Sequence, residues 1–312
     1  MNRLLAVLVL GSLSANAQTF TTETFGSGAN QFSIDFVEIG NPGNAPDTTG
    51  MPNPAGPVGY IYNLGKYEIS RDMINKANAI GGLVLTLQDM TSYGGNGGNK
   101  PATGITWNEA AKFVNWLNIS TGSVAAYKFD GIGNFILWQN GDSGFQSLNP
   151  FRNSLARYFL PTRNEWYKGA YGSADGIWYD YATGSNSAPS QVSGGLLLGT
   201  SVYGQSGGPA DIYDAGGLSP FGTMAQNGNV KEWTENPFDS NPPNPGSASR
   251  EVRGGAWDSG SSILASTDRG LLMPTMEDRS IGFRIAMVPE PSSLSLLLAG
   301  GAVFMPGSRR KG

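Results

Sequence analysis

The stretch NGNVKEWTEN, residues 227–236, carries groups that could do chemistry at close spacing. A Gly-Asn turn at 228–229 is followed by the carboxylate of Glu232 and the indole of Trp233. Such a carboxylate can bind a hard cation or act as an acid or base, and it can equally fix a buried turn by hydrogen bonds. The stretch is therefore a candidate metal site, a candidate catalytic loop or a packed corner.

The chain of 312 residues contains no cysteine and no histidine. This composition removes disulfides, thiolate nucleophiles, imidazole bases and the commonest ligands of zinc, copper and iron. The carboxylates, hydroxyls, amines and amides that remain suit calcium far better than transition metals. We therefore expect no copper, iron or zinc cofactor.

Four carboxylates are candidates for an acid–base pair: Glu165, Glu232, Asp258 and Glu277. Hydrolysis of a glycosidic bond needs two carboxyl groups roughly 5–10 Å apart, and the sequence does not say whether the fold brings any two together. Carboxylates beside Trp and Arg in such motifs usually hold loops together. A carboxylate-based hydrolase is therefore kept as an alternative to a structural role.

The elements that must position these groups are short. The β-prone runs at 32–38 and 58–64 predict two early strands, and Ser70 is placed to cap a helix over 71–80. With 45 glycines and 19 prolines, much of the backbone must lie in turns and loops. No repeat or interdomain linker is evident, so we expect one domain over residues 18–287.

Two capping boxes are predicted further along the chain. Thr106 and Glu109 open the clearest helical segment, whose apolar residues recur at spacings of three and four. Thr162 and Glu165 repeat the pattern in LPTRNEW. Arg253 and Arg284 lie beside or near glycines on predicted central strands, where their guanidinium groups are suited to loop carbonyls or to pairing with Glu165 or Glu232.

The N-terminal segment has the pattern of a secretory signal peptide over residues 1–17. Arg3 precedes an apolar run at 4–10, and Ala15-Asn16-Ala17 is a small-x-small cleavage site. The apolar run is too short to span a bilayer. We expect an exported protein that begins near Gln18.

The C-terminal segment, residues 288–312, has the features of a second targeting signal. Pro289-Glu290-Pro291 precedes an apolar run at 294–305 and a basic cluster at 309–311, an arrangement that favours transient membrane anchoring. This segment resembles the PEP-CTERM sorting tail of exported bacterial proteins. The resemblance implies an exosortase-type sorting machinery as a partner, and a location at the cell surface or in an extracellular polysaccharide matrix.

The charge distribution argues against polyanionic partners. The whole chain carries a net charge of −4, and removal of both ends takes away mostly basic residues. An acidic domain without basic clusters is not suited to nucleic acid or anionic lipid.

Six ordered motifs between about Phe32 and Ala286 resemble the formylglycine-generating enzyme, or sulfatase-modifying factor, domain family. They are GKYEIS (65–70), GITWNEAAKFVNWLN (104–118), YFLPTRNEWYKGAYG (158–172), GNVKEW (228–233), VRGGAWDSG (252–260) and IGFRIA (281–286). The resemblance implies an α+β, C-type-lectin-like fold with little regular secondary structure.

The resemblance also implies a chemistry that this sequence lacks. Formylglycine-generating enzymes oxidise a substrate cysteine with copper held by two cysteines, and related sulfoxide synthases bind iron through histidines. Here the family's active-site serine falls at Ala256, and its two cysteines fall near Ser259 and Leu264. Both oxidative chemistries are excluded by composition, although a divergent enzyme of the family remains an alternative.

The family's structural calcium site maps onto the stretch quoted first. The resemblance implies ligands from the backbone carbonyls of Gly228 and Val230 and from the carboxylate of Glu232. Ala225 stands where the family usually has an Asn or Asp side chain, which weakens the site. Calcium binding and a hydrogen-bonded turn packed by Trp233 are the two expectations for this loop.

The function expected from the sequence is that of an exported, non-catalytic, lectin-like domain that binds a polysaccharide or a surface protein. Its glycine-rich loops carry five aromatic residues with ring faces suited to sugar stacking: Tyr171, Trp178, Tyr179, Tyr181 and Tyr203. Aromatic residues in loops are also ordinary packing material, so no binding residue is assigned among them.

Overall fold

The computed structural model describes residues 20–289. The predicted signal peptide (1–17), the apolar run (294–305) and almost all of the predicted sorting tail (288–312) lie outside the described residues. Within the described part, no helix is long and apolar enough to cross a membrane.

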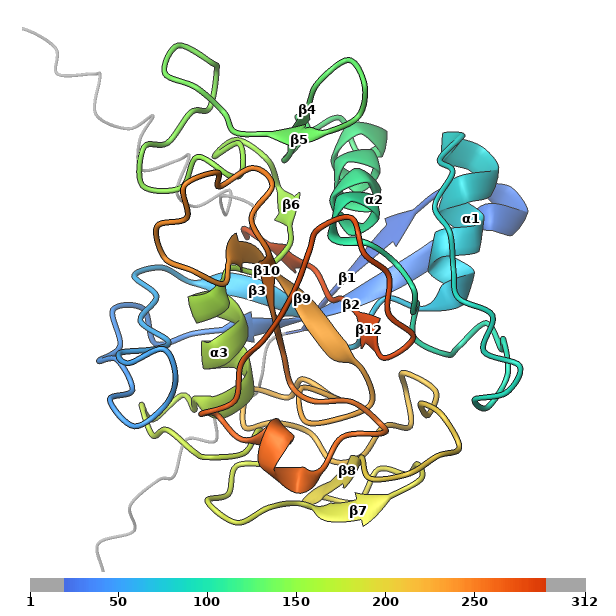
Figure 1. Ribbon diagram of the computed structural model, residues 1–312, viewed down its shortest axis with the longest axis vertical. Helices are drawn as coiled ribbons and strands as arrows, with labels where there is room; N and C mark the ends of the chain where they lie inside the picture. Colours follow the sequence, from blue (N-terminus) through green and yellow to red (C-terminus); the bar gives the residue numbers. More distant parts are fainter. Residues whose placement is uncertain (1–19, 290–312) are drawn as a thin grey trace, which may run out of the picture.

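Two sheets organise the fold (Figure 1). The larger sheet is antiparallel throughout. The smaller sheet pairs β12 parallel to β9 and its other strands antiparallel. In spatial order, the larger sheet contains β1 (Phe20–Phe25), β2 (Phe32–Ile39), β3 (Tyr62–Gly65), β13 (Ala286–Met287) and β6 (Tyr158–Phe159), and the smaller sheet contains β11 (Gly270–Leu272), β10 (Arg250–Arg253), β9 (Lys231–Pro237) and β12 (Ile281–Gly282).

Two further strand pairs lie outside these sheets, at opposite ends of the view in Figure 1. The first is the antiparallel hairpin of β4 (Lys128–Phe129) and β5 (Phe135–Ile136). The second is the parallel pair of β7 (Ser190–Val192) and β8 (Thr200–Val202). Two single-turn 3₁₀ helices complete the elements, at Gly28–Asn30 and Ser261–Leu264.

The three α-helices of the described residues begin where the sequence predicts. Helix α1 (Arg71–Gly81) is capped by Ser70, whose side chain accepts from the backbone N–H of Met73. Helices α2 (Trp107–Ser120) and α3 (Arg163–Tyr171) both begin with a complete capping box. The early strands are also confirmed, although β3 covers only the end of the predicted run at 58–64.

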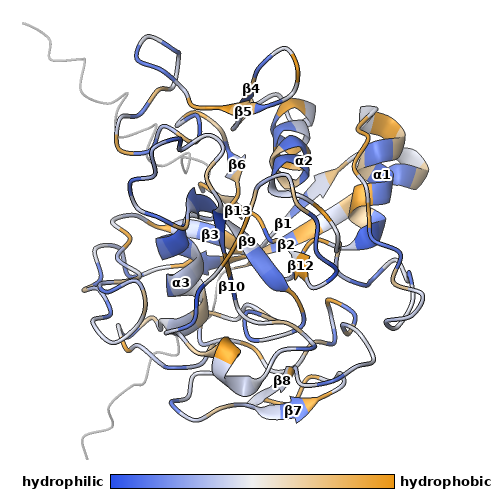
Figure 2. Ribbon diagram, viewed as in Figure 1, coloured by the Kyte–Doolittle hydropathy of each residue, from blue (hydrophilic) through white to orange (hydrophobic). Residues whose placement is uncertain are grey.

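Helix α2 anchors the main core. Its apolar face, which includes Phe113, Val114 and Leu117, is fully buried, and each such side chain contributes roughly 1.5–3 kcal/mol of transfer free energy. Figure 2 shows hydrophobic and hydrophilic residues sharing α1 and α2, as expected of helices with one buried face. Asn118 joins α2 to β6, because its amide nitrogen donates to the carbonyl of Tyr158 at 2.8 Å.

Between these elements the chain runs in long, ordered loops. The longest connection, residues 203–230, joins β8 to β9, and glycines take left-handed backbone conformations at several turns, including Gly228 with φ of 89°. The α+β class with little regular secondary structure is therefore confirmed.

Candidate functional site

Glu232 lies at the start of β9, fully buried beside Arg284. The guanidinium group donates through Nε to Oε2 and through Nη2 to Oε1, both at 2.6 Å. The indole Nε1 of Trp166 also donates to Oε2 at 2.6 Å. Both carboxylate oxygens therefore have strong, charge-assisted partners within the fold.

The other two predicted calcium ligands belong to the same corner. Gly228 donates its N–H to the carbonyl of Gly254 at 2.7 Å, and Val230 donates its N–H to the carboxyl Oε1 of Glu68 at 3.2 Å. Among residues 20–289, no group of three or more acidic side chains is placed to hold a metal ion. Because a cation at Glu232 would have to displace Arg284, the arrangement does not fit a calcium ligand at this carboxylate.

Glu68 is a second buried carboxyl group in this corner. Its Oε2 accepts from the amide nitrogen of Asn229 at 2.6 Å. Burial raises the pKa of Glu68 well above its usual range, and Glu232 adds to the rise while Arg284 opposes it. The corner thus joins two carboxyl groups and one guanidinium group, and we assign it a structural role.

The family's catalytic positions are also packed into the fold. Ala256 and Leu264 are fully buried, and the hydroxyl of Ser259 accepts from the N–H of Ala256 at 2.9 Å. These three positions carry no group able to hold copper or to form a thiolate.

The candidate carboxylates outside this corner have separate partners. Asp258 lies 3.8 Å from Arg279, and Glu277 accepts from the hydroxyl of Thr86 at 3.3 Å. Glu165 is fully buried beneath Arg152. None of the four candidate carboxylates therefore contacts another, so the fold does not pair them for acid–base chemistry.

Sequence reasoning missed Glu235, which shares Arg152 with Glu165. Arg152 lies 3.0 Å from Glu165 and 3.7 Å from Glu235, and both glutamates are fully buried. Burial raises the pKa of Glu235, although the charge of Arg152 opposes the rise. Burial also acts to raise the pKa of Glu165, but Arg152 and hydrogen bonds from Tyr60 and Thr162 outweigh it, so the pKa of Glu165 is lowered. Two carboxyl groups with opposed pKa shifts are typical of acid–base sites, but neither of these is exposed to a substrate.

The predicted loop aromatics are largely engaged in packing. Tyr171 is 1% exposed and lies in α3, so it offers no ring face for stacking. Trp178 packs against Tyr167 at a centroid distance of 5.6 Å and donates to the carbonyl of Ala45. Tyr203 donates to the carbonyl of Pro189. These contacts support the packing interpretation for these three rings.

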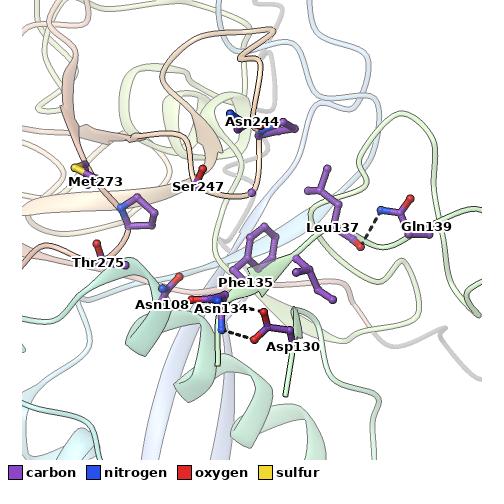
Figure 3. A pocket seen from close by; sticks show the side chains of 14 residues that line it. Asn108, Asp130, Asn134, Phe135, Leu137, Gln139, Asn244, Ser247, Met273 and Thr275 are labelled. Carbon is purple, nitrogen blue, oxygen red and sulfur yellow. Dashed lines mark hydrogen bonds between the residues drawn. The ribbon is translucent and has the colours of Figure 1, made fainter. Parts of the chain in front are cut away.

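A pocket of about 740 Å³ lies between the β4–β5 hairpin, the start of α2, the β9–β10 loop (238–249) and the segment after β11 (Figure 3). Its size falls within the range of ordinary ligand sites, roughly 300–1,000 Å³. We call it the amide-lined pocket, because its polar lining is mostly side-chain amides. It is lined by Asn108, Asp130, Asn134, Phe135, Ile136, Leu137, Gln139, Asn244, Pro245, Gly246, Ser247, Met273, Pro274 and Thr275.

The amides of this pocket come from separate segments of the chain. Figure 3 shows Phe135 between Ser247 on one side and Asn134 on the other. The Oδ1 atom of Asn108, in the first turn of α2, is buried without a hydrogen-bond partner. Asn244, on the β9–β10 loop, is exposed. No single motif signals such a site, because its members are brought together only by the fold.

Asp130 is the only carboxylate in the described part of the chain that lines this pocket, and it is occupied by its own turn. Asp130 accepts from the backbone N–H groups of Ile132 and Asn134 at 3.0 and 2.8 Å, and from the side chain of Asn134 at 3.1 Å. These hydrogen bonds lower the pKa of Asp130. The groups left to contact a ligand are therefore mainly neutral amides and hydroxyls.

Comparison with solved structures supports the fold. Variable protein 1 of Treponema denticola is 18% identical, with a TM-score of 0.58 over 86% of this chain and 99% of that one. CarF is 19% identical, with a TM-score of 0.52 over 74% of this chain and 87% of that one. PvdO from Pseudomonas aeruginosa is 17% identical, with a TM-score of 0.50 over 86% of this chain and 98% of that one. No curated protein sequence matches significantly.

The family model for the sulfatase-modifying factor enzyme 1-like domain matches residues 63–288, more than half of the chain. With the architecture above, this match confirms the C-type-lectin-like fold expected from the six motifs. The chain belongs to the sulfatase-modifying factor domain family.

Proposed function

We propose that this protein is an exported, non-catalytic binding protein whose amide-lined pocket takes a unit of a neutral polysaccharide. The observation that carries the proposal is the pocket of about 740 Å³ lined by Asn108, Asn134, Gln139 and Asn244. A side-chain amide offers both donors and an acceptor, as does each hydroxyl of a sugar. Met273 and Ile136 add exposed apolar surface for the carbon face of a ring.

A neutral ligand agrees with the charges around the pocket. Asp130 is satisfied by its own turn, and no Lys or Arg among residues 20–289 lines the pocket. The net charge of −4 would repel an acidic polymer at low salt. The side chains that line the pocket thus favour binding of sugar hydroxyls over binding of carboxylate or sulfate groups on a ligand.

A binding role agrees better with the site than hydrolysis does. Glu165, Glu232 and Glu235 are all fully buried and lie beside arginines, so none is in a position to contact a substrate. The oxidative chemistry of the family would need a thiol or imidazole that the chain does not contain.

Export is part of the proposal and rests on the two chain ends. Ala15-Asn16-Ala17 supports cleavage near Gln18, and Pro289-Glu290-Pro291 with the basic cluster supports sorting to the surface or matrix by an exosortase-type machinery. Intact-mass measurement of cell-surface material tests both ends. Retention of residues 309–311 on that material would contradict processing of the tail.

A glycan array that contains neutral and acidic oligosaccharides tests the binding role. We expect binding to neutral glycans, unchanged by EDTA, and at least tenfold weaker binding in Asn244→Ala. Asn140→Ala is the matched control, because Asn140 is exposed near the pocket but does not line it. Absence of glycan binding, or release of shortened products from a bound glycan, would overturn the proposal.

A further inference from the structure

We infer that a hollow around Tyr60 is a second saccharide site, so that one neutral polysaccharide chain is held at two points. This inference rests on the proposed function. The hollow, here called the Tyr60 pocket, has a volume of about 470 Å³. Its polar lining includes Asn53, Asn164, Asn236 and Ser240. Like the amide-lined pocket, it presents neutral side chains from several separate segments.

Tyr60 provides an exposed aromatic ring in a fixed position. The residue is 43% exposed, yet its hydroxyl donates to Oε1 of Glu165 and accepts from Nη2 of Arg152 at 3.2 Å. Arg152 is itself fixed, because its guanidinium lies 3.7 Å from the ring centroid of Phe159. Tyr62 packs against this ring in a T-shaped arrangement at a centroid distance of 6.1 Å. The exposed part of a ring held by its hydroxyl offers apolar surface to a sugar at little cost in conformational entropy.

The amides around Tyr60 are oriented by the fold and keep one end free. Asn164 and Asn236 use their side-chain oxygens to accept from the backbone N–H groups of Gly56 and Arg163, at 3.1 and 2.8 Å. Asn53 uses its amide nitrogen to donate to a backbone carbonyl at 2.6 Å. Two NH₂ groups and one carbonyl oxygen are left without a partner among the described residues, a mixture that matches sugar hydroxyls.

Arg163 is the one charged residue within 20–289 that lines the Tyr60 pocket, and its side chain is engaged inside the fold. Nε of Arg163 lies 2.6 Å from Glu251, and Nη2 donates to the carbonyls of Pro237 and Phe238 at 2.7 and 3.0 Å. Neutral recognition groups thus dominate both pockets, so the same neutral polymer suits both.

The β9–β10 loop, residues 238–249, connects the two pockets. Ser240 lines the Tyr60 pocket, while Asn244 and Ser247 line the amide-lined pocket. A third hollow of about 270 Å³ shares Asn244 and Ser247 and is also lined by Asp239, the neighbour of Ser240. The loop therefore forms a wall common to three hollows, which suits an extended chain better than a single sugar. Linked binding at two points raises affinity by roughly 10²–10⁴.

Stoichiometry tests the second site directly. Native mass spectrometry would titrate the purified protein with neutral disaccharides of glucose, mannose, galactose and xylose. We expect two bound disaccharides per chain for wild type and one for each of two matched variants, Asn164→Asp and Asn244→Asp. Asn164→Asp keeps the oxygen that accepts from Gly56 and removes the free NH₂ group, and thermal melting checks that both variants fold.

Chain length provides the second measurement. Calorimetry with the hexasaccharide of the best-bound sugar should show at least tenfold tighter binding than the disaccharide, and either variant should lose that gain. One disaccharide per wild-type chain, lost in Asn244→Asp and unchanged in Asn164→Asp, would overturn the second site and leave the proposed function standing. Absence of all saccharide binding would overturn both.

Discussion

Arg284 and Glu232 form a bidentate ion pair in which neither side chain is exposed to solvent. The remaining donors of Arg284 bond to the carbonyls of Gly65 at 2.8 Å and Met224 at 2.7 Å. The pair therefore ties β9 to the end of β3 and to the turn before β9. In the fold, the carboxylate of this motif is held by an arginine and an indole, which favours the hydrogen-bonded turn over a metal ligand.

We expect Arg284→Met to lower the free energy of unfolding by about 3–5 kcal/mol, because it leaves the buried carboxylate of Glu232 without its cation. Urea denaturation measures this change. Lys76→Met is the control, since Lys76 pairs with Asp72 on the surface of α1 and should cost less than about 1 kcal/mol. A loss in Arg284→Met no larger than in the control would contradict this role of the ion pair.

Calcium is expected to leave the melting temperature of the wild-type protein unchanged relative to EDTA. A site at about 100-fold excess of calcium over its Kd would stabilise the native state by roughly 2.7 kcal/mol, which differential scanning fluorimetry detects readily. Glu232→Gln should be destabilised equally with and without calcium. A calcium-induced rise in wild type that disappears in Glu232→Gln would restore the calcium interpretation of Gly228, Val230 and Glu232.

The carboxyl group of Glu68 should make stability depend on pH. Because its pKa is raised in the folded state, the native protein holds a proton that the unfolded chain releases above about pH 4.3, the usual value for glutamate. Stability from this group is therefore greatest below that pH and falls as pH rises toward the folded pKa. Glu68→Gln should show a shallower decline in urea-unfolding free energy between pH 5 and 8, and an unchanged slope would argue against a neutral Glu68.

The cap of α2 should respond to removal of one hydroxyl group. Thr106 accepts from the N–H of Glu109 at 3.1 Å, while the Glu109 carboxylate accepts from the N–H of Thr106 at 2.9 Å. Thr106→Ala should cost about 1 kcal/mol in thermal or urea unfolding, and Thr106→Ser should restore most of it. Equal losses of unfolding free energy in both variants would show that the methyl group of Thr106, not its capping hydroxyl, stabilises the helix.

This capping box was predictable because its two residues lie three positions apart and act on each other. The same holds for Thr162 with Glu165 and for the buried face of α2, which local spacing determines. The family motifs extended the prediction to the fold class. Sequence reasoning was least informative where partners are distant.

The residues that form the candidate site lie far apart in the sequence. Arg152 meets Glu235, and Asn108 meets Asn244 across one pocket, only after the chain has folded. Burial also reversed the expectation for Tyr171, whose glycine-rich neighbourhood suggested an exposed loop although the residue ends α3. No periodicity in the sequence encodes such long-range contacts.

Arg250 is expected to position the walls of the amide-lined pocket. It is fully buried, donates to the carbonyls of Pro245 and Gly246 at 2.8 and 3.2 Å, and lies 5.2 Å from the ring centroid of Phe135. Burial lowers its pKa to about 10, so it remains charged at neutral pH. One side chain thus contacts both the β9–β10 loop and Phe135 in the pocket lining, a pairing that sequence alone would not reveal.

Arg250→Lys keeps the charge but loses the planar fork that serves two carbonyls and the stacking on aromatic rings. We expect faster hydrogen exchange of the backbone amides at residues 246–248 and weaker binding of neutral saccharides, with exchange in α3 unchanged. Arg279→Lys is the matched control, because Arg279 also lies over aromatic rings, those of Tyr93 and Trp257, but its side chain is 46% exposed and it lines neither pocket. Unchanged exchange at 246–248 in Arg250→Lys would show that the loop is held without the guanidinium group, and the positioning role would be wrong.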